Sequence, residues 1–465
     1  MLLGALGLST FTVSIAATTV VPALSVIQRT FDVTASDTAW LVTAYFLVAS
    51  TATPILSRLG DMRGKRSVLV AALAAFLAGS IVCALSPSLA GEILGRALQG
   101  LGAAVFPLAY GIARDQLEPE RVPTAIGFLA ATPAVGGALG LPFGGLIAEH
   151  ADVSAIFWAQ GLLGLVALGT CWKVLPDSGT RIPGRVDLRG AVVFSIGFGL
   201  PLLAVSRANV WGWGSPTTLA CFAVGLVILA AWTKLELHTD QPLVNIHTLR
   251  RRPVFLTNVT TIVAGFGLFG SFILLPQLAQ VPTSTGFGLG LTASAAGLLL
   301  VPNAVVNAIT SSQSGRVIGR WGARTPLLVG CSIAVVAFGL LTVLHGSAIF
   351  IVLWSMLLAV GVGLSYPAMP TLILDAVELH ETSEASGVNT IMRNAGAAAG
   401  SAVAGSVLAA HVAPNGLPTD AGFALAFLIA SIVSAVAVLI GLRIPVRARM
   451  PVPVLALSIA PRENR

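Results

Sequence analysis

Charged residues are scarce in this chain. They make up 10% of its 465 residues, while hydrophobic residues make up 55%, and a soluble domain carries about 25% charged residues. Long stretches such as 39–55 and 67–91 contain no charge at all, and an α-helix needs roughly 20 apolar residues to cross a bilayer. The scarcity of charge excludes a water-soluble protein and indicates an all-α polytopic membrane protein.

The sequence is also poor in the residues that build metal and cofactor sites. Its four cysteines lie inside apolar runs without CxxC spacing, which is typical of small buried residues rather than of disulfides or metal ligands. It contains neither an HExxH motif nor a Walker-type glycine loop, so we predict no metal, no cofactor and no direct use of ATP. The net charge of +7 does not indicate nucleic acid, because the basic residues fall between hydrophobic segments.

Fourteen segments are apolar enough to be interpreted as transmembrane helices. They are 2–26, 39–57, 67–86, 91–112, 124–147, 154–175, 187–206, 217–233, 254–276, 293–313, 326–345, 347–372, 388–410 and 423–444. The connections between them are short, so no soluble domain is inserted.

The basic residues are distributed asymmetrically around these segments. If both termini are cytoplasmic, 22 of the 26 Lys and Arg residues lie in connections or the tail on the cytoplasmic side, and two, Arg29 and Arg207, lie in connections on the other side. Because Lys and Arg are enriched in cytoplasmic loops, we predict that both termini are cytoplasmic and that the helix count is even.

One short basic motif occurs twice. Residues 57–66 read Ser-Arg-Leu-Gly-Asp-Met-Arg-Gly-Lys-Arg, and a weaker copy follows at 314–324. A motif used once per half indicates internal duplication. We therefore expect an N-terminal six-helix half at 1–175, two additional helices with linkers at 176–253, a C-terminal six-helix half at 254–444 and a cytoplasmic tail at 445–465.

Three stretches carry recognisable motifs. Residues 57–66 fit the pattern G-x-L-x-D-R-x-G-R-[RK] at Leu59, Asp61, Gly64 and Arg66, but Ser57 and Met62 depart from it, and Lys65 replaces an arginine. Residues 94–104 read Leu-Gly-Arg-Ala-Leu-Gln-Gly-Leu-Gly-Ala-Ala. Residues 136–145 resemble G-x-x-x-G-P-x-x-G-G, with the proline one residue late.

In this order, the motifs resemble those of the major facilitator superfamily, in its fourteen-helix drug:proton antiporter branch. The resemblance covers essentially the whole chain. It implies two pseudo-symmetric six-helix halves around a central cavity, with two extra central helices, in the cell (cytoplasmic) membrane. It also implies a monomeric secondary transporter whose partners are a hydrophobic small molecule, protons and the lipid bilayer, and which exports drugs or antibiotics by alternating access.

One departure from the family pattern concerns the coupling to protons. Fourteen-helix drug exporters usually carry an Asp about nine residues before a proline in the first helix, and here the position counted back from Pro22 is Val13. Uncoupled transport or import of a metabolite or lipid-like molecule is therefore the alternative. A receptor or membrane enzyme would need an appended domain or a catalytic cluster, and the sequence contains neither.

Residues of two kinds are candidates for gating. Asp61 is the only acid in its motif, so we expect its carboxylate to hold a neighbouring helix end while the cytoplasmic side is shut; the alternative is a solvated turn that only sets topology. Glycines and a proline could let helices rock against each other, or could simply pack a static bundle. The full set is Asp61, Arg63, Gly64, Lys65, Arg66, Gly136, Gly140, Pro142, Gly144, Gly145, Arg316 and Arg320.

A second set is predicted to face a cavity or to carry protons. Glu92 precedes Arg96 by four residues, so the two share one helical face, and we hypothesise that they form a proton-responsive pair; the alternatives are plain neutralisation of Arg96 or its snorkelling. The set for proton coupling or the cavity is Glu92, Arg96, Gln99, Gly100 and Arg393. Candidates for the substrate cavity are Tyr45, Phe106, Tyr110, Trp158, Asn303, Asn307 and Asn389, each of which could instead serve helix packing.

Overall fold

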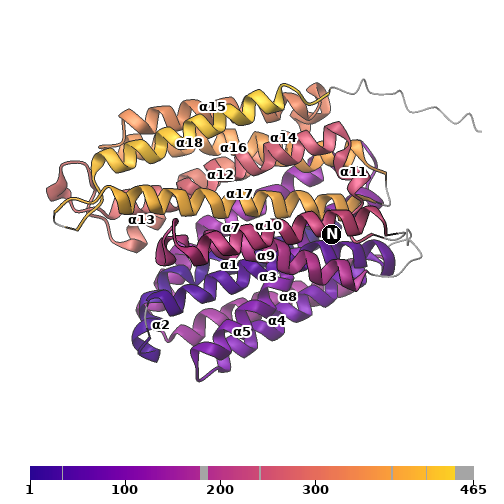
Figure 1. The fold of residues 1–465 in the computed structure, drawn as a ribbon, viewed down its shortest axis with the longest axis horizontal. Helices are drawn as coiled ribbons and strands as arrows, with labels where there is room; N and C mark the ends of the chain where they lie inside the picture. The colour runs from indigo at the N-terminus through magenta and orange to yellow at the C-terminus, as the bar shows by residue number, and fades with distance from the viewer. Residues whose placement is uncertain (34, 178–186, 240–241, 379–380, 415, 446–465) are drawn as a thin grey trace, which may run out of the picture.

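The computed structural model describes residues 1–33, 35–177, 187–239, 242–378, 381–414 and 416–445. In these ranges the regular elements are helices, apart from one isolated β-bridge between Val412 and Pro418. Figure 1 shows the helices packed side by side, with the N-terminal helices in the lower part of the view and the C-terminal helices in the upper part.

The helices fall into three groups along the chain. The first group is α1 (Leu2–Thr19), η1 (Val21–Ala23), α2 (Leu24–Phe31), α3 (Ala35–Arg63), α4 (Lys65–Leu85), α5 (Leu89–Gly100), η2 (Leu101–Ala104), α6 (Val105–Gln116), α7 (Val122–His150) and α8 (Val153–Val174). The second is α9 (Leu188–Trp211), α10 (Pro216–Leu237) and α11 (Ile246–Arg250). The third is α12 (Arg252–Gln280), η3 (Thr283–Thr285), α13 (Ala293–Leu299), α14 (Val301–Trp321), α15 (Arg324–Val343), α16 (Ala348–Ala376), α17 (Thr382–Ala410) and α18 (Asp420–Gly441).

The multi-pass helical architecture predicted from the sequence is confirmed. Among the described residues, eleven helical segments are long and apolar enough to cross a membrane, and 189–205 is a shorter apolar helix. The predicted segments 254–276 and 388–410 lie within the 29-residue helices α12 and α17, which are not among the eleven. The count of fourteen therefore stays a prediction.

The basic motif at 57–66 is largely helical rather than a turn. Helix α3 continues to Arg63, six residues beyond the predicted end, and α4 begins at Lys65. Gly64 alone joins them, with φ at 106°, a conformation that glycine adopts without steric cost. The junction therefore holds Asp61 and Lys65 on two adjoining helix ends instead of in a solvated loop.

Each half has its own apolar core. Phe76 and Leu108 belong to the N-terminal core, and Phe338 and Phe427 belong to the C-terminal one. The two halves meet where α3 packs on α17 and α7 packs on α14. Helix α9 lies against both α3 and α17, so the central helices are placed beside both halves (Figure 1).

The predicted glycine run lets α7 approach α1 closely. A side chain at Gly136, Gly140 or Gly144 would collide with α1 at Ser14, Thr18 or Thr19. Gly145 and Pro142 of the same run are buried. The run thus packs two helices of the N-terminal half, and its gating role stays a prediction.

Candidate functional site

The end of α3 forms a charged contact with the start of α17, which we call the α3–α17 contact and which consists of Arg58, Asp61 and Glu384. Asp61 is buried, and its Oδ2 accepts a hydrogen bond of 3.1 Å from the backbone N–H of Glu384. Glu384 lies in the first turn of α17, where free N–H groups carry the positive end of the helix dipole. The structure therefore places Asp61 at a neighbouring helix end, as the sequence analysis expects.

An ion pair adds to the same contact. Arg58 Nη1 lies 3.0 Å from Glu384 Oε2, and both side chains are mostly buried. Glu384 Oε1 accepts a hydrogen bond of 2.6 Å from the backbone N–H of Asn245. Removing one partner of a buried pair costs about 3–5 kcal/mol, because it leaves an uncompensated charge. The contact thus joins α3 of one half to α17 of the other with charges that water reaches poorly.

Glu384 titrates differently from an exposed glutamate. It precedes the predicted membrane segment 388–410, in the first turn of α17. Burial raises the pKa of Glu384 to about 7, and the Arg58 guanidinium and the Asn245 N–H oppose that rise. The charge state of the contact is therefore sensitive to pH close to neutrality.

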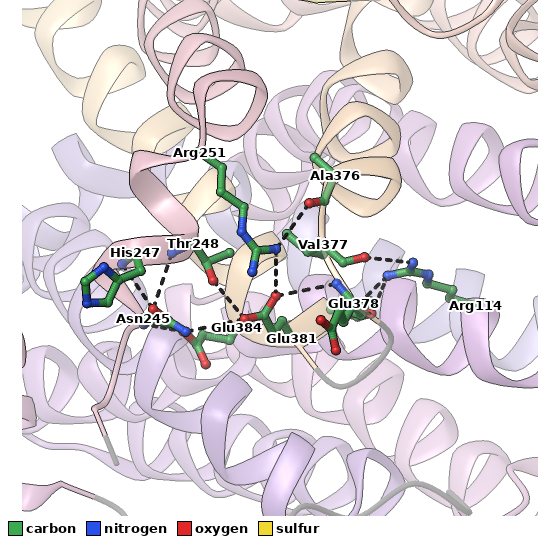
Figure 2. A network of polar contacts seen from close by, with 11 residues as sticks. Arg114, Asn245, His247, Thr248, Arg251, Ala376, Val377, Glu378, Glu381 and Glu384 are labelled. Atoms are coloured by element: carbon green, nitrogen blue, oxygen red, sulfur yellow. Dashed lines mark hydrogen bonds and ion pairs between the residues drawn. The ribbon is translucent and has the colours of Figure 1, made fainter. Parts of the chain in front are cut away.

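The start of α17 and the residues before it are held from two sides, by α6 and by the region around α11, as Figure 2 shows. Arg114 of α6 donates to Thr382 Oγ1 at 2.6 Å and to the Val377 carbonyl at 3.2 Å. On the other side, Glu381 accepts a hydrogen bond of 2.7 Å from Thr248 Oγ1, and Arg251 lies 3.3 Å from it. The short helix α11 and the start of α12 therefore support the same helix end that Asp61 caps.

The remaining charges of the first motif belong to the N-terminal half. Lys65 is buried and lies 2.6 Å from Asp115 Oδ2 and 3.6 Å from Asp61 Oδ1. Arg66 binds Asp177 and the Trp172 carbonyl at the end of α8, at 2.6 and 2.7 Å. Arg63 is exposed, so it contributes least to the buried network.

The second copy of the motif is arranged differently. Arg316 and Arg320 are exposed; Arg316 donates to Gln313 on its own helix, and Arg320 lies over the neighbouring Trp321 ring. Arg324 donates to the Gly441 and Leu442 carbonyls at the end of α18. The expected matching role of Arg316 and Arg320 in gating thus finds no support in the contacts that they make.

Arg96 is fully buried inside the N-terminal half, which excludes snorkelling. It donates to the carbonyls of Leu41 and Ala16 at 3.1 and 3.0 Å and to Gln99 Oε1 at 2.7 Å. Its guanidinium also lies 4.4 Å from the centre of the Tyr45 ring. Arg96 therefore ties α5 to α1 and α3.

Glu92 and Arg96, which we hypothesise to form a proton-responsive pair, do not contact each other directly; that role stays a prediction. Both are buried, but among the described residues no ion pair within 4 Å joins them, and Glu92 Oε2 has no hydrogen-bond partner. Helical spacing places two side chains on one face, but here the guanidinium points toward Gln99 and backbone carbonyls instead. Glu92 is thus a buried carboxylate with a free oxygen.

Polar contacts of Gln99 and Tyr45 extend this network. Gln99 Nε2 donates to Ser80 Oγ and Gln160 Oε1, both at 2.8 Å. Tyr45 Oη donates to the carbonyl of Val13 at 3.2 Å, and a side chain at Gly100 would lie 2.6 Å from the Tyr45 carbonyl. These residues pack the N-terminal half internally, so the packing alternative fits their contacts better than a cavity lining.

Most of the candidate cavity residues also serve packing. Asn303 and Asn307 of α14 donate to the carbonyls of Ser355 and Ala359 on α16, and Asn389 of α17 donates to Asn258 and Thr261 of α12. Phe106 belongs to the N-terminal core. Trp158 is 49% exposed on α8. It therefore lies apart from the other candidates for the substrate cavity, which are more buried.

Arg393 and Tyr110 are brought together with a residue that the sequence analysis missed, Tyr366. The Arg393 guanidinium lies 5.5 Å from the centre of the Tyr366 ring and close to Tyr110. All three side chains are buried. They come from α17, α16 and α6, so both halves contribute to this cluster.

Two polar features of this region escaped the sequence analysis. Glu381 and Glu384 stand before the predicted segment 388–410, and helix α17 begins six residues earlier than that segment; the acids in a Glu-Thr-Ser-Glu run could have indicated a helix start. Tyr366 lies in an apolar run and is flanked by Pro367, so it carried no signal of its own.

Comparison with known proteins gives consistent matches. A family model described as the Major Facilitator Superfamily matches residues 6–401 and, a second time, residues 260–457. The multidrug resistance protein Stp of Mycobacterium tuberculosis is 30% identical over 412 residues, which are 87% of this chain and 75% of Stp. The tetracenomycin C resistance and export protein of Streptomyces glaucescens is 27% identical over 86% of this chain and 74% of its own length. The lincomycin resistance protein LmrB of Listeria monocytogenes is 26% identical over 83% and 82%.

Solved structures show the same fold. The human organic anion transporter MFSD10 (TETRAN) matches with a TM-score of 0.67 over 95% of this chain and 98% of that chain, at 16% identity. The proton:xylose symporter XylE matches with a TM-score of 0.64 over 96% and 95%, at 12% identity. At these identities the likeness concerns the fold alone.

Proposed function

The chain belongs to the Major Facilitator Superfamily, and from this premise we propose that it exports hydrophobic drugs or antibiotics in exchange for protons by alternating access. It is a multi-pass membrane transporter, and members of the family bind small-molecule substrates. The proposal extends to fourteen membrane helices, a monomer in the cell membrane, and both termini in the cytoplasm. The names of relatives such as Stp and the tetracenomycin C exporter support export of drugs.

One observation carries the mechanism: the α3–α17 contact joins the two halves at one end of the bundle through buried charges. Arg58 and Asp61 of one half bind Glu384 of the other, and Arg114 binds the preceding segment. For substrate to pass, this end must open, which requires these bonds to break together. We propose that the contact closes the cytoplasmic end and that its opening admits the substrate.

Proton coupling is the second part of the proposal. Val13 stands where related exporters usually have an Asp, which favours the alternative of uncoupled transport or import of a metabolite or lipid-like molecule. Glu92 is our candidate for carrying the proton, because it is buried and one of its oxygens has no partner. It is the fourth residue of α5, close to the short connection that precedes this helix.

Proton flux in vesicles tests the coupling. Purified protein in liposomes containing a pH-sensitive dye is supplied with candidate drugs from a resistance screen in an efflux-deficient host. We expect the wild type to move protons when a transported drug is added, and Glu92→Gln to lose that flux. Equal flux in both would assign coupling to another residue, and drug transport without any flux would favour the uncoupled alternative.

Orientation is tested separately. Reporter fusions at both termini and within 234–252 are expected to be cytoplasmic. An external signal at 234–252 would mean that the helix pair before it crosses the membrane differently from the proposal.

A further inference from the structure

Two buried arginines of this protein have very different surroundings. Arg96 donates to two backbone carbonyls and to Gln99. Arg393 is 7% exposed, and in the described part of the chain no carboxylate lies within 4 Å of it. A charged group is costly inside a membrane protein unless it is paired or faces a cavity that a ligand or water can enter. Arg393 is therefore a buried cation for which the described residues supply no counter-charge.

The groups beside Arg393 are two neutral tyrosines, which supply no negative charge. Tyr366 presents its ring to the guanidinium at 5.5 Å, and Tyr110 lies beside it. The hydroxyls of both tyrosines are buried and lack a hydrogen-bond acceptor. Buried hydroxyls normally find a partner, so two unpartnered hydroxyls converge here on a guanidinium without a counter-charge.

From this convergence we propose that Arg393, Tyr110 and Tyr366 form an anion-binding subsite, and that the transported substrate is an organic anion or zwitterion with an apolar body. The inference rests on the proposed transport function and names its substrate class. A carboxylate placed here would accept hydrogen bonds from the guanidinium and from both hydroxyls. Hydrogen bonds to an ionised acceptor are stronger than those between neutral groups.

The position of the cluster suits a transported ligand. Tyr110 belongs to α6 of the N-terminal half, whereas Tyr366 and Arg393 belong to α16 and α17 of the C-terminal half. A ligand held there touches both halves, as alternating access requires. Tyr366 also lines a small, mostly apolar pocket of the C-terminal half with Phe338, Leu358 and Val362.

The same surroundings disfavour cations. An ammonium group placed beside Arg393 would be repelled by it, and Val13 removes the carboxylate that related exporters usually carry in the first helix. A cationic drug would therefore lack a counter-charge at this site and meet a like charge instead.

A matched pair of dyes tests this specificity. Fluorescein and rhodamine 6G share a flat xanthene ring system, but the first is an anion and the second is a cation. Binding is measured by fluorescence anisotropy with purified protein in nanodiscs of phosphatidylcholine, so that anionic lipid headgroups do not occupy the site. Empty nanodiscs correct for partitioning into lipid.

We expect the wild type to bind fluorescein at least tenfold more tightly than rhodamine 6G. Arg393→Gln should weaken fluorescein binding roughly tenfold or more, Arg393→Lys should keep part of it, and Tyr110→Phe and Tyr366→Phe should each weaken it by roughly threefold to tenfold. Arg316→Gln is the matched control, because it removes an exposed arginine from α14, and it should bind fluorescein as the wild type does.

The tyrosine variants keep the test valid if Arg393→Gln does not fold, because they remove single oxygen atoms. Preference for rhodamine 6G, absence of fluorescein binding, or unchanged binding in Arg393→Gln and both tyrosine variants would each overturn the subsite. Dye flux in proteoliposomes separates this result from the proposed function. If fluorescein binds in an Arg393-dependent way but no dye is transported, the export function is contradicted and the subsite is supported. If rhodamine 6G alone is exported, the export function is supported and the subsite is contradicted.

Discussion

The two copies of the basic motif occupy equivalent places in the two halves, and their common features show what the fold requires. Gly64 and Gly322 join consecutive helices with φ of 106° and 75°. Two residues later, Arg66 binds the Trp172 carbonyl at the end of α8, and Arg324 binds the Gly441 carbonyl at the end of α18. A glycine that turns the chain and an arginine that ties two helix ends are therefore structural parts of each half.

The differences between the copies lie where the halves meet. Counted from these glycines, Asp61 corresponds to Gly319 and Lys65 to Ala323. Asp61 binds the Glu384 N–H of the opposite half, whereas nothing lies within 4 Å of a side chain built at Gly319. Within the described ranges, only the first copy thus has charges that contact the opposite half.

The second interface uses close approach instead of charge. A side chain at Gly315 would collide with the backbone of Thr124 at the start of α7, and one at Gly127 would lie 2.6 Å from the Ser311 carbonyl. Small residues allow this approach. From this comparison we propose that the α3–α17 contact controls when the end opens, while α7 and α14 provide a surface on which the halves move.

The largest expected effect comes from breaking the buried ion pair. Glu384→Ala leaves Arg58 without its partner, which should destabilise the closed end by about 3–5 kcal/mol. We expect loss of drug resistance in cells and a large increase in the distance between spin labels placed across that end.

The double variant Arg58→Met/Glu384→Ala is the control for this experiment, because it removes both charges. It should recover much of the closed population. If the double variant is as open as Glu384→Ala alone, charge pairing is not what holds the end shut. Arg316→Gln, at the position equivalent to Arg58 in the second copy, should leave the distance unchanged.

The next effect concerns Asp61. Asp61→Asn keeps the size of the side chain but removes the charge that faces the first turn of α17 and Lys65. A charge-assisted hydrogen bond contributes about 1.5–3 kcal/mol, so we expect transport to fall roughly tenfold at normal membrane abundance. Normal transport by a well-expressed Asp61→Asn variant would mean that this motif sets only the membrane topology and not the gating.

A smaller effect is expected at the glycine interface. Gly315→Ala should lower the melting temperature in detergent, because the added methyl group meets the Thr124 backbone and overpacking costs about 1–3 kcal/mol. Gly319→Ala lies four residues along the same helix, with open space around it, and should be neutral or slightly stabilising. Equal melting temperatures for the two variants would contradict the close approach of α14 and α7.

The sequence predicts more of the fold than of the site, for physical reasons. Apolar length decides which segments become membrane helices, so most segments could be located. Helical spacing places Glu92 and Arg96 on one face, yet it cannot say that the Arg96 guanidinium binds the Leu41 and Ala16 carbonyls instead. Hydrophobicity likewise does not separate Trp158, which is exposed, from Phe157, which is buried.

The α3–α17 contact could be predicted only in part. The lone acid in a basic motif indicates that Asp61 has a partner, and the structure provides one. That partner is a backbone N–H on a helix more than 300 residues away, and a single sequence carries no information about such a long-range contact. The predicted start of that helix, at 388 instead of Thr382, also excluded Glu384 from consideration.

The smallest and most specific effect is a dependence of the contact on pH. Burial raises the pKa of Glu384 to about 7 in the closed state, from an ordinary value of 4.5. If opening returns the side chain to water, the closed state binds the proton more tightly than the open one. Low pH therefore favours closure. The ratio of closed to open protein falls as pH rises from about 4.5 through about 7, by at most roughly tenfold per pH unit.

Spin labels on Arg63→Cys and His247→Cys, in a Cys221→Ser background, can measure this by their distance distribution between pH 4.5 and 8. Both positions are exposed, and the other native cysteines are buried. We expect the longer-distance population to grow as pH rises, and Glu384→Gln to remove most of that growth. Arg58, Asp61 and Glu381 also face Glu384, so the same titration in Asp61→Asn separates the two acids. A pH dependence that survives in Glu384→Gln and disappears in Asp61→Asn would assign the proton to Asp61, and the charge that controls opening would then lie on α3 instead of α17.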